Sequence, residues 1–239
     1  MEKEGTVVMF KNWTLFEKAW LIISTVIILV LSILWDDTLL GTISSIAGII
    51  CVVLAAKGKI GTYVVGVVQC TTYGYIAYGY GLYGESMLNL LFYLPIQFIG
   101  FYLWFKNKKS PDEAAYGEEI YAKRLTTKQW LYTGAGIIVA YISYSLFLSR
   151  IGANLAGLDG LAVVLSVVAQ ILMIMRYAEQ WILWIVVNVI TIALWAIILV
   201  QQGGNDWTVF VMWCAFLVNS IYGYINWIKI SKAQGAVQV

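Results

Sequence analysis

Long apolar segments alternate with short polar ones along nearly the whole chain. Eight of these segments are each close to the roughly 20 residues that a helix needs to cross the hydrocarbon core of a bilayer. Only one polar stretch is long, Lys106 to Gln129, and its charges and Pro111 are typical of a connector outside the membrane. The predicted transmembrane helices cover residues 19–35, 38–56, 60–82, 86–105, 130–149, 160–176, 180–201 and 207–228.

Composition supports an all-α integral membrane protein. Apolar residues make up 61% of the 239 residues, and charged residues make up 12%, against roughly 25% in a soluble domain. No small-residue cleavage site follows the first apolar segment, so we expect a retained helix and not a signal peptide. The three cysteines lie singly in apolar segments, which predicts packing residues and neither a disulfide framework nor a metal site.

The basic residues are distributed unevenly between the two predicted sides of the membrane. The two termini and the loops after the second, fourth and sixth helices hold 14 of the 15 Lys and Arg residues, and the other loops hold only Arg150. By the positive-inside rule both termini are cytoplasmic, and one helix more or fewer would destroy the asymmetry. We therefore predict a multi-pass protein of the inner (plasma) membrane with eight transmembrane helices.

The second to fourth predicted helices resemble the sixth to eighth. At an offset of 119 residues Lys57 aligns with Arg176 and Gln69 with Asn188, and at an offset of 123 "GFYLW" aligns with "GYINW". Three helices leave the chain on the wrong side of the membrane to begin an identical copy, and the helix at 130–149 brings it back. The pattern therefore predicts one N-terminal helix followed by 3+1+3 parallel repeats, a transporter architecture whose site lies near midplane between the halves.

This arrangement divides the chain into five predicted units. They are 1–37, a cytoplasmic N-terminus with an extra helix; 38–105, the first three-helix repeat; 106–159, a cytoplasmic loop and a linker helix; 160–228, the second three-helix repeat; and 229–239, a cytoplasmic tail.

Four carboxamide side chains fall near the predicted bilayer centre, two from each repeat: Gln69, Gln97, Asn188 and Asn219. A primary amide that faces lipid would leave its polar atoms unsatisfied at a cost of several kcal/mol, so these side chains face the protein interior or water. Hydrogen bonding between helices explains any one of them equally well. Four amides at one depth, paired between the repeats, favour a cavity.

Aromatic and polar side chains surround these amides at helical spacings. Tyr73 is one turn from Gln69, Asn89 and Tyr93 share a face with Gln97, and Trp184 shares one with Asn188. Trp181 lies close to the cytoplasmic boundary, where an interfacial belt residue is the alternative. The predicted substrate-binding residues are Gln69, Tyr73, Asn89, Gln97, Trp181, Trp184, Asn188 and Asn219.

The missing residue types narrow the function further. The chain has no histidine, and all 13 acidic residues fall in loops or at helix ends, whereas proton-coupled carriers usually keep a titratable group inside the membrane. A ligand phosphate would find no buried cation, but aromatic rings would accept a cationic ligand. Without a nucleophile–base pair, a metal set or a phosphate loop, we expect no enzyme activity, catalytic residue, metal, cofactor or nucleic-acid partner.

Two stretches carry a resemblance to a known family. "RYAEQWILWIVVN" (Arg176–Asn188) resembles the R-x-x-E-x-W-x-x-W-x-x-x-N signature of the PnuC family of vitamin transporters. "LYGESMLNLLFYLPIQFIGFYLW" (Leu82–Trp104) resembles the family's stretch that ends in Q-x-x-G-x-Y-x-W. With the 3+1+3 layout, the resemblance extends from about Leu39 to Ile230.

The resemblance implies a fold like that of the SWEET sugar transporters and uptake of nicotinamide riboside, a vitamin B3 precursor for NAD biosynthesis, by facilitated diffusion. It implies a homotrimer, and a cytoplasmic kinase that phosphorylates the substrate. On the matching positions, Trp184, Asn188 and Gln97 would contact the ligand, and Arg176 and Glu179 would belong to a turn.

This chain departs from a symmetric site, because Thr62 and Val65 align with Trp181 and Trp184, so we expect the second repeat to hold most of the ligand ring. Three alternatives stay open. The substrate could be thiamine or another nucleoside-like vitamin, the chain could be a membrane receptor or capture subunit that needs a partner, and the amides could serve only to join helices.

Overall fold

The computed structural model describes residues 13–79, 83–110, 116, 118–150, 156–202 and 207–237. Helices dominate these residues, and the only extended pairings among them are two isolated bridges in the connector. The helices are α2 (Leu15–Leu34), α3 (Leu39–Lys57), α4 (Gly61–Gly79), α5 (Tyr83–Met87), the π-helix η1 (Leu88–Tyr93), α6 (Leu94–Lys106), α7 (Thr127–Arg150), α8 (Ala156–Ile174), α9 (Gln180–Gln202) and α10 (Trp207–Val237). The predicted all-α class is confirmed.

Parts of the predicted segments lie outside the described residues. They are residues 1–12 of the N-terminal segment, residues 80–82 of the third predicted helix, most of 111–117 in the loop with Pro111, and the links at 151–155 and 203–206.

Six helices within the described ranges are long and apolar enough to cross a membrane. They cover Leu15–Leu34, Leu39–Lys57, Glu85–Lys106, Thr127–Phe147, Gln180–Ile197 and Trp207–Gln234. The apolar part of α8 is shorter, Gly160–Ile174, and α4 is 19 residues long but carries Thr, Gln and Tyr side chains. The fold is therefore that of a membrane helix bundle with six apolar spans, and the eight predicted crossings include these two less apolar helices.

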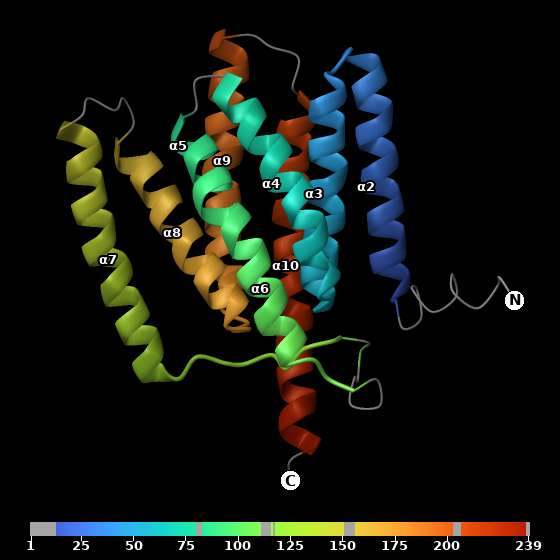
Figure 1. The fold of residues 1–239 in the computed structure, drawn as a ribbon, viewed down its shortest axis with the longest axis vertical. Coiled ribbons are helices and arrows are strands. Elements are labelled where there is room, and N and C mark those ends of the chain that lie inside the picture. The colour runs from blue at the N-terminus through green and yellow to red at the C-terminus, as the bar shows by residue number, and fades with distance from the viewer. Residues whose placement is uncertain are drawn as a thin grey trace, which may run out of the picture.

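The helices run side by side in one bundle (Figure 1). α2 lies at one flank beside α3, and α7 lies at the other flank beside α8, so both are outermost. The turns α3–α4 and α8–α9, the connector from α6 to α7, and both described chain ends lie at the same end of the bundle. This is the end to which the charge pattern assigns the basic residues.

The two tight turns at this end have the same construction. Gly58 and Arg176 both adopt the left-handed conformation, with φ of 72° and 68°. Each turn carries the two hydrogen bonds of a Schellman ending, which satisfy the last carbonyls of the preceding helix. The four bonds join Gly58 N–H to Ala55 O, Lys59 N–H to Leu54 O, Arg176 N–H to Met173 O and Tyr177 N–H to Leu172 O.

The matched turns correct the sequence alignment by one residue. Gly58 corresponds to Arg176, an offset of 118, whereas the sequence aligned Lys57 with it at 119. Patterns of apolar residues could not detect this shift, since it lies in the backbone conformation of the turns. The corrected counterparts are Tyr63 for Trp181 and Gly66 for Trp184, in place of Thr62 and Val65.

Two crossed hydrogen bonds near the turns join a first set of helices, α3, α4 and α6, to a second set, α8, α9 and α10. Trp104 Nε1 on α6 donates to the carbonyl of Met173 on α8 (3.3 Å), and Trp227 Nε1 on α10 donates to the carbonyl of Ala55 on α3 (3.0 Å). Ala55 and Met173 are matched positions in the two turns, and both indoles are fully buried. The last helix of each set is thus bonded to the first helix of the other.

The connector between α6 and α7 binds both turns. The N–H of Glu119 donates to the carbonyl of Gly58 (2.9 Å), and the N–H of Lys123 donates to the carbonyl of Arg176 (2.7 Å). The carboxylate of Glu179, just before α9, also binds the connector, since it accepts from Arg124 Nε and from the N–H of Leu125. The polar stretch is therefore fixed against the bundle by main-chain hydrogen bonds.

A widened turn interrupts the crossing from α5 to α6. Pro95 lacks an N–H and its ring clashes with the carbonyl four residues earlier, so a regular α-helix cannot pass through it unchanged. The π-helix η1 precedes it, over Leu88–Tyr93. The predicted segment 86–105 therefore exists but is not a uniform helix, and single-turn π segments often occur at functional sites.

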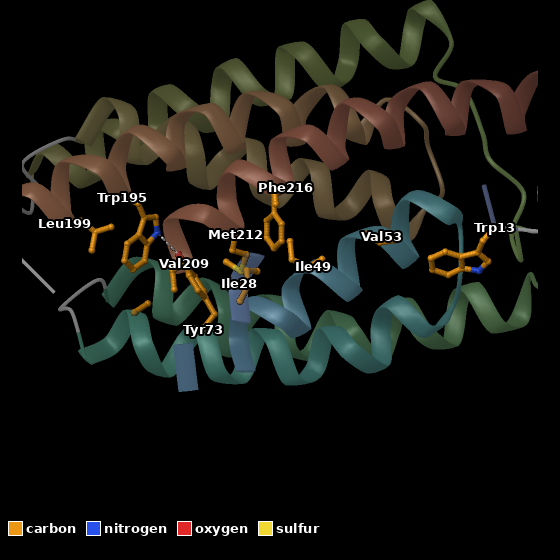
Figure 2. Packing of buried hydrophobic residues seen from close by; sticks show 12 residues of the cluster. Trp13, Ile28, Ile49, Val53, Tyr73, Trp195, Leu199, Val209, Met212 and Phe216 are labelled. Carbon is orange, nitrogen blue, oxygen red and sulfur yellow. Dashed lines mark hydrogen bonds between the residues drawn. The ribbon is translucent and has the colours of Figure 1, made fainter. Parts of the chain in front are cut away.

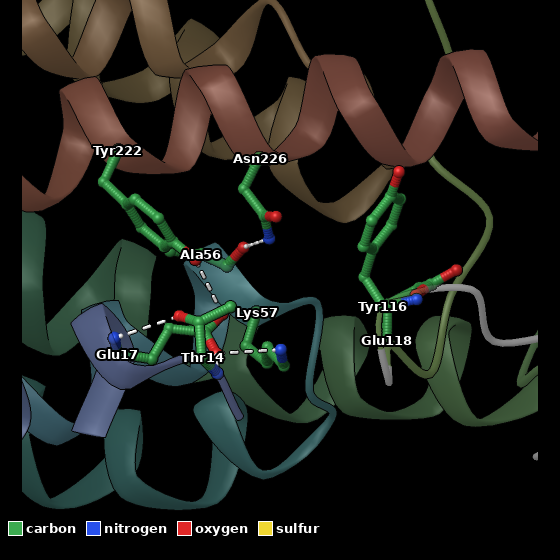
Figure 3. Close-up of polar contacts among 8 residues, drawn as sticks. All are labelled: Thr14, Glu17, Ala56, Lys57, Tyr116, Glu118, Tyr222 and Asn226. Carbon is green, nitrogen blue, oxygen red and sulfur yellow. Dashed lines mark hydrogen bonds and ion pairs between the residues drawn. The ribbon is translucent and has the colours of Figure 1, made fainter. Parts of the chain in front are cut away.

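A buried ion pair attaches α2 to the rest of the bundle (Figure 3). Glu17 Oε2 accepts from Lys57 Nζ (2.9 Å) and from the N–H of Thr14 (2.7 Å), and its Oε1 accepts from the hydroxyl of Tyr222 (2.8 Å). The side chains of Glu17 and Lys57 are only 1% and 2% exposed. One carboxylate thus caps α2 and joins it to α3 and α10.

We predict that Glu17→Ala lowers the free energy of unfolding by about 3–5 kcal/mol, because it leaves the buried Lys57 ammonium without its carboxylate. The neighbouring exposed residue provides the control, Lys18→Ala, which should change stability little. Unfolding in mixed detergent micelles measures both. A cost below about 1 kcal/mol for Glu17→Ala would show that water reaches this pair.

Candidate functional site

A cavity of about 120 Å³ lies inside the bundle, between helices of both sets. Its volume is close to the ~150 Å³ of an engineered protein cavity that holds benzene, so it has room for an aromatic ring. Seven of the eight predicted site residues line it: Gln69, Tyr73, Asn89, Gln97, Trp181, Trp184 and Asn188. Residues that are far apart in the chain and were grouped only by depth therefore meet at one place.

Two polar pairs that line the cavity occupy matched positions. Asn188 Nδ2 on α9 donates to Ser220 Oγ on α10 (2.9 Å), and Gln97 Nε2 on α6 lies 3.5 Å from Cys70 Sγ on α4. At the corrected offset of 118 Asn188 corresponds to Cys70, and at the offset of 123 that aligns "GFYLW" with "GYINW" Ser220 corresponds to Gln97. Each pair thus joins one carboxamide to one short side chain. The carboxamide of one pair occupies the position that matches the short side chain of the other pair. Gly66 makes room for Gln97, since a Cβ there would overlap the carboxamide.

Asn219 is the predicted site residue that does not line the cavity. It is 1% exposed, and its Nδ2 donates to the carbonyl of Val52 on α3 (2.8 Å). Two turns further along α10, Asn226 makes the same kind of bond to the carbonyl of Ala56 (2.8 Å). Asn219 therefore joins α10 to α3. The predicted depth of Asn219 did not specify the direction of its side chain, and its neighbour Ser220 is the residue that lines the cavity.

Trp181 is part of the cavity wall, so the belt interpretation is wrong. Its side chain is 3% exposed, and its ring packs at 6.2 Å from that of Trp227 and against the backbone at Gly223, where a Cβ would lie 2.7 Å from the indole. Its Nε1 has no hydrogen-bond partner among the described residues. Tyr63 packs against Trp104 in the same way, at the matched position.

Two cavity residues, Tyr73 and Asn89, belong to one group of hydrogen bonds, of which Figure 2 shows the bond between Trp195 and Tyr73. Trp195 Nε1 donates to the hydroxyl of Tyr73 (3.2 Å), which lies 3.5 Å from a carboxylate oxygen of Glu85. Asn89, in the π-helix, donates to the backbone carbonyl of Glu85 (2.9 Å). These bonds fix Tyr73 and Asn89 in orientation, and they place one carboxylate just outside the cavity.

Sequence reasoning missed several lining residues. Gln170 on α8 is a fifth carboxamide in the lining, after Gln69, Asn89, Gln97 and Asn188, and it was overlooked because it lies nearer to the cytoplasmic turn than they do. Tyr93 was named only as an extension of the Gln97 face, yet its ring lies 6.4 Å from that of Trp184 and its hydroxyl pairs with Ser166. Ser220 carried no signal, since a lone serine in an apolar helix is common.

The cavity lining is uncharged. Lys, Arg, Asp and Glu are all absent from the described residues that line it. Arg176 lies in the turn below the cavity, where burial lowers the pKa of its guanidinium without removing the positive charge. The described part of the chain also contains no cluster of His, Cys, Asp or Glu that could hold a metal ion. The site can bind a flat, polar molecule by stacking and hydrogen bonds.

Comparison with known proteins gives a consistent set of similarities. The sequence profile of the family described as "Nicotinamide mononucleotide transporter" matches residues 38–229. The "Nicotinamide riboside transporter PnuC" of Neisseria mucosa is 43% identical, over 97% of this chain and 90% of its own length. The protein of the same name from Haemophilus influenzae is 40% identical, over 92% of this chain and 93% of its own.

A solved structure is similar over nearly the whole fold. The "Crystal structure of the Vitamin B3 transporter PnuC" has a TM-score of 0.85 and 43% sequence identity to this chain, and the match covers 95% of this chain and 99% of the other.

Proposed function

The chain belongs to the PnuC family of membrane transporters, and from this membership we propose that it carries nicotinamide riboside across the membrane by facilitated diffusion. The observation that carries the proposal is the cavity lining, which combines aromatic rings and carboxamides with no charged side chain among the described residues. Nicotinamide riboside is a flat pyridinium cation on an uncharged, hydroxylated sugar. Indole and phenol rings attract such a cation without a counter-charge, and amides bind the hydroxyl groups.

The uncharged lining also favours the riboside over its phosphorylated form. The family profile is described by the mononucleotide, whereas the similar proteins are named for the riboside. A phosphate would bring roughly −1.5 to −2 charges into a site with no basic side chain to pair with it. The carboxylate of Glu85 near the outer end would repel it further and would attract a cation.

We assign roles to the lining residues by their chemistry. Trp181 and Trp184 would stack on the pyridinium ring, with the free Nε1 of Trp181 available to a ligand oxygen. Asn188 on α9 and Gln97 on α6 would hydrogen-bond the ligand, and each is already held by a short side chain, Ser220 or Cys70. The remaining contacts would come from Gln69, Tyr73 and Asn89.

The proposed transport cycle uses two three-helix repeats, 38–105 and 160–228, in the 3+1+3 SWEET-like arrangement. The matched Schellman turns and the crossed indole bonds support this division. α7 would be the linker helix and α2 the additional N-terminal helix. The cavity between the repeats would open alternately to the two sides by a small rotation of one repeat against the other.

We further propose that the chain lies in the inner membrane with both termini cytoplasmic, on the distribution of basic residues. Because a uniporter only equilibrates its substrate, net uptake would depend on a cytoplasmic kinase, whose charged product fits the cavity poorly. A homotrimer rests on family membership alone. The same family membership indicates a transporter and not an enzyme.

The first test is selectivity. We predict that nicotinamide mononucleotide binds at least about a hundredfold more weakly than the riboside, a difference of roughly 3 kcal/mol. Titration of the purified protein with the riboside, the mononucleotide and thiamine, followed by tryptophan fluorescence, measures this. Equal affinity for the first two would mean that a basic residue outside the lining reaches the ligand, and tighter thiamine binding would replace the proposed substrate.

Energy coupling gives a second prediction. No Asp, Glu, His, Lys or Arg side chain is among the described residues that line the cavity, so riboside flux into liposomes should be independent of sodium and of a pH gradient at zero membrane potential. Radiolabelled riboside should reach equal concentrations on both sides without ATP. Accumulation above equilibrium under a pH gradient would contradict facilitated diffusion, and binding without any flux would indicate a capture subunit.

A third prediction separates the cavity wall from helix joining. Asn188→Leu should abolish detectable riboside binding yet leave the protein folded, since interhelical polar contacts average about 0.6 kcal/mol. Asn219→Leu is the matched control, because Asn219 is equally buried but bonds only to α3; it should lower the melting temperature and keep the parental affinity. Trp184→Phe should weaken binding about tenfold or less, because a phenyl ring still stacks.

The reverse pattern would disprove the site. If Asn188→Leu binds the riboside normally but melts far earlier than the parent, the Asn188–Ser220 contact serves only to join α9 to α10.

A further inference from the structure

A second opening lies between α7 and α8, away from the substrate cavity. Its volume is about 350 Å³, more than ten times the ~30 Å³ share of a water molecule, and it is wide open on one side. The α7 side is a stripe of residues at helical spacing that includes Gln129, Thr133 and Gly136, and the α8 side is an apolar stripe that includes Ile171 and Met175. We refer to it as the α7–α8 groove.

The groove occupies the half of the bundle next to the connector. Its α7 residues come from the first half of that helix, and its α8 residues come from the last two turns and the following turn. With the cytoplasmic orientation proposed above, the groove therefore opens sideways into the cytoplasmic leaflet. α7 is the outermost helix on this flank, as Figure 1 shows.

Positive charge gathers at the cytoplasmic mouth of the groove. Tyr177 lines the groove, and Lys123 Nζ lies 5.7 Å from the centre of its ring. Lys128 is in the first turn of α7 and shares a face with the groove residue Tyr132, four residues later. Both lysines are exposed, and neither has a carboxylate partner within the described ranges.

Among the described residues, the carboxylate found at this mouth is already neutralised. Glu179 is 2% exposed and accepts from Arg124 Nε (2.7 Å). The main chain of Lys123 is fixed by two hydrogen bonds to the α8–α9 turn, so this ammonium is attached to a rigid position. Two uncompensated positive charges thus remain at the level of the lipid headgroups.

We infer that the α7–α8 groove is a binding site for an anionic phospholipid, with an acyl chain in the groove and the headgroup phosphate between Lys123 and Lys128. A lateral opening in hydrocarbon is filled either by lipid chains or by protein. Anionic headgroups of the cytoplasmic leaflet are attracted to basic residues by about 1 kcal/mol for each Lys or Arg. The carboxylates that the structure describes at this end of the bundle are each already paired with a basic side chain of the same chain, so a second copy would bring none of them free to these lysines, and the charge favours lipid; they are Glu17, Glu118, Glu119 and Glu179.

Native mass spectrometry of the purified protein, titrated with phosphatidylglycerol in the absence of riboside, tests the site. Lys123→Gln and Lys128→Gln should each weaken binding about fivefold, and the pair about 25-fold. Lys232→Gln, an exposed lysine on α10, is the charge control and should bind like the parent. Phosphatidylcholine, which has the same chains and no net charge, should bind much more weakly than phosphatidylglycerol.

Two glycines of α7 supply a matched test of the groove itself. A Cβ at Gly136 or at Gly134 would meet no atom within 4 Å, but only Gly136 lines the groove. Gly136→Leu should fill the groove and remove the bound lipid, and Gly134→Leu should leave it in place. Thr133→Leu fills the same groove from a neighbouring turn if Gly136→Leu does not fold, as judged by the melting temperature.

The inference fails if phosphatidylcholine binds as tightly as phosphatidylglycerol, or if Gly136→Leu and Thr133→Leu retain the parental lipid affinity. It also fails if Gly136→Leu changes the oligomer mass and not the lipid content, because a second copy would then fill the groove. Riboside binding is measured separately, so a chain that binds riboside but no lipid would refute this site and leave the proposed function intact.

Discussion

Polar groups inside the membrane depend on the protein for their hydrogen-bond partners, because hydrocarbon offers none. The bundle meets this constraint in two ways. Asn219, Asn226, Trp104 and Trp227 donate to main-chain carbonyls near the ends of α3 and α8, and these bonds join the helices. Asn188 and Gln97 bond only to short side chains beside an opening, so part of their hydrogen-bonding capacity remains available to a ligand.

Apolar periodicity and the positive-inside count were enough to predict an all-α membrane protein and the ends of most helices. The depth of the amides was enough to group seven residues that line one cavity. Depth does not specify which way a side chain points, and for that reason Asn219 was assigned to the cavity in place of its neighbour Ser220. Trp181 was ambiguous for the same reason, since a belt residue and a wall residue can occupy one depth.

The remaining differences come from backbone features that composition does not report. The one-residue error in the alignment arose at a left-handed residue, which is glycine in one turn and arginine in the other. The π-helix before Pro95 rotates Asn89 and Tyr93 relative to a regular helix, so helical spacing alone gave their direction only approximately. In the two polar pairs of the cavity, the carboxamide and the short side chain also exchange places between the matched positions. A search for like residues at like positions cannot detect such an exchange.

The crossed indole bonds have a consequence for how the chain is made. The carbonyl of Ala55, near the end of α3, accepts a hydrogen bond from Trp227. The ribosome adds Trp227 only when almost the whole chain has been synthesised. Trp104 likewise donates its hydrogen bond to the carbonyl of Met173, a residue that is synthesised later. α3 and α6 therefore each lack a hydrogen-bond partner when they enter the bilayer, and they must remain able to pack against helices that arrive later. Biogenesis of this protein would then end in one late closing step, with α10 as the final component and any truncation before it leaving an open, degradable intermediate.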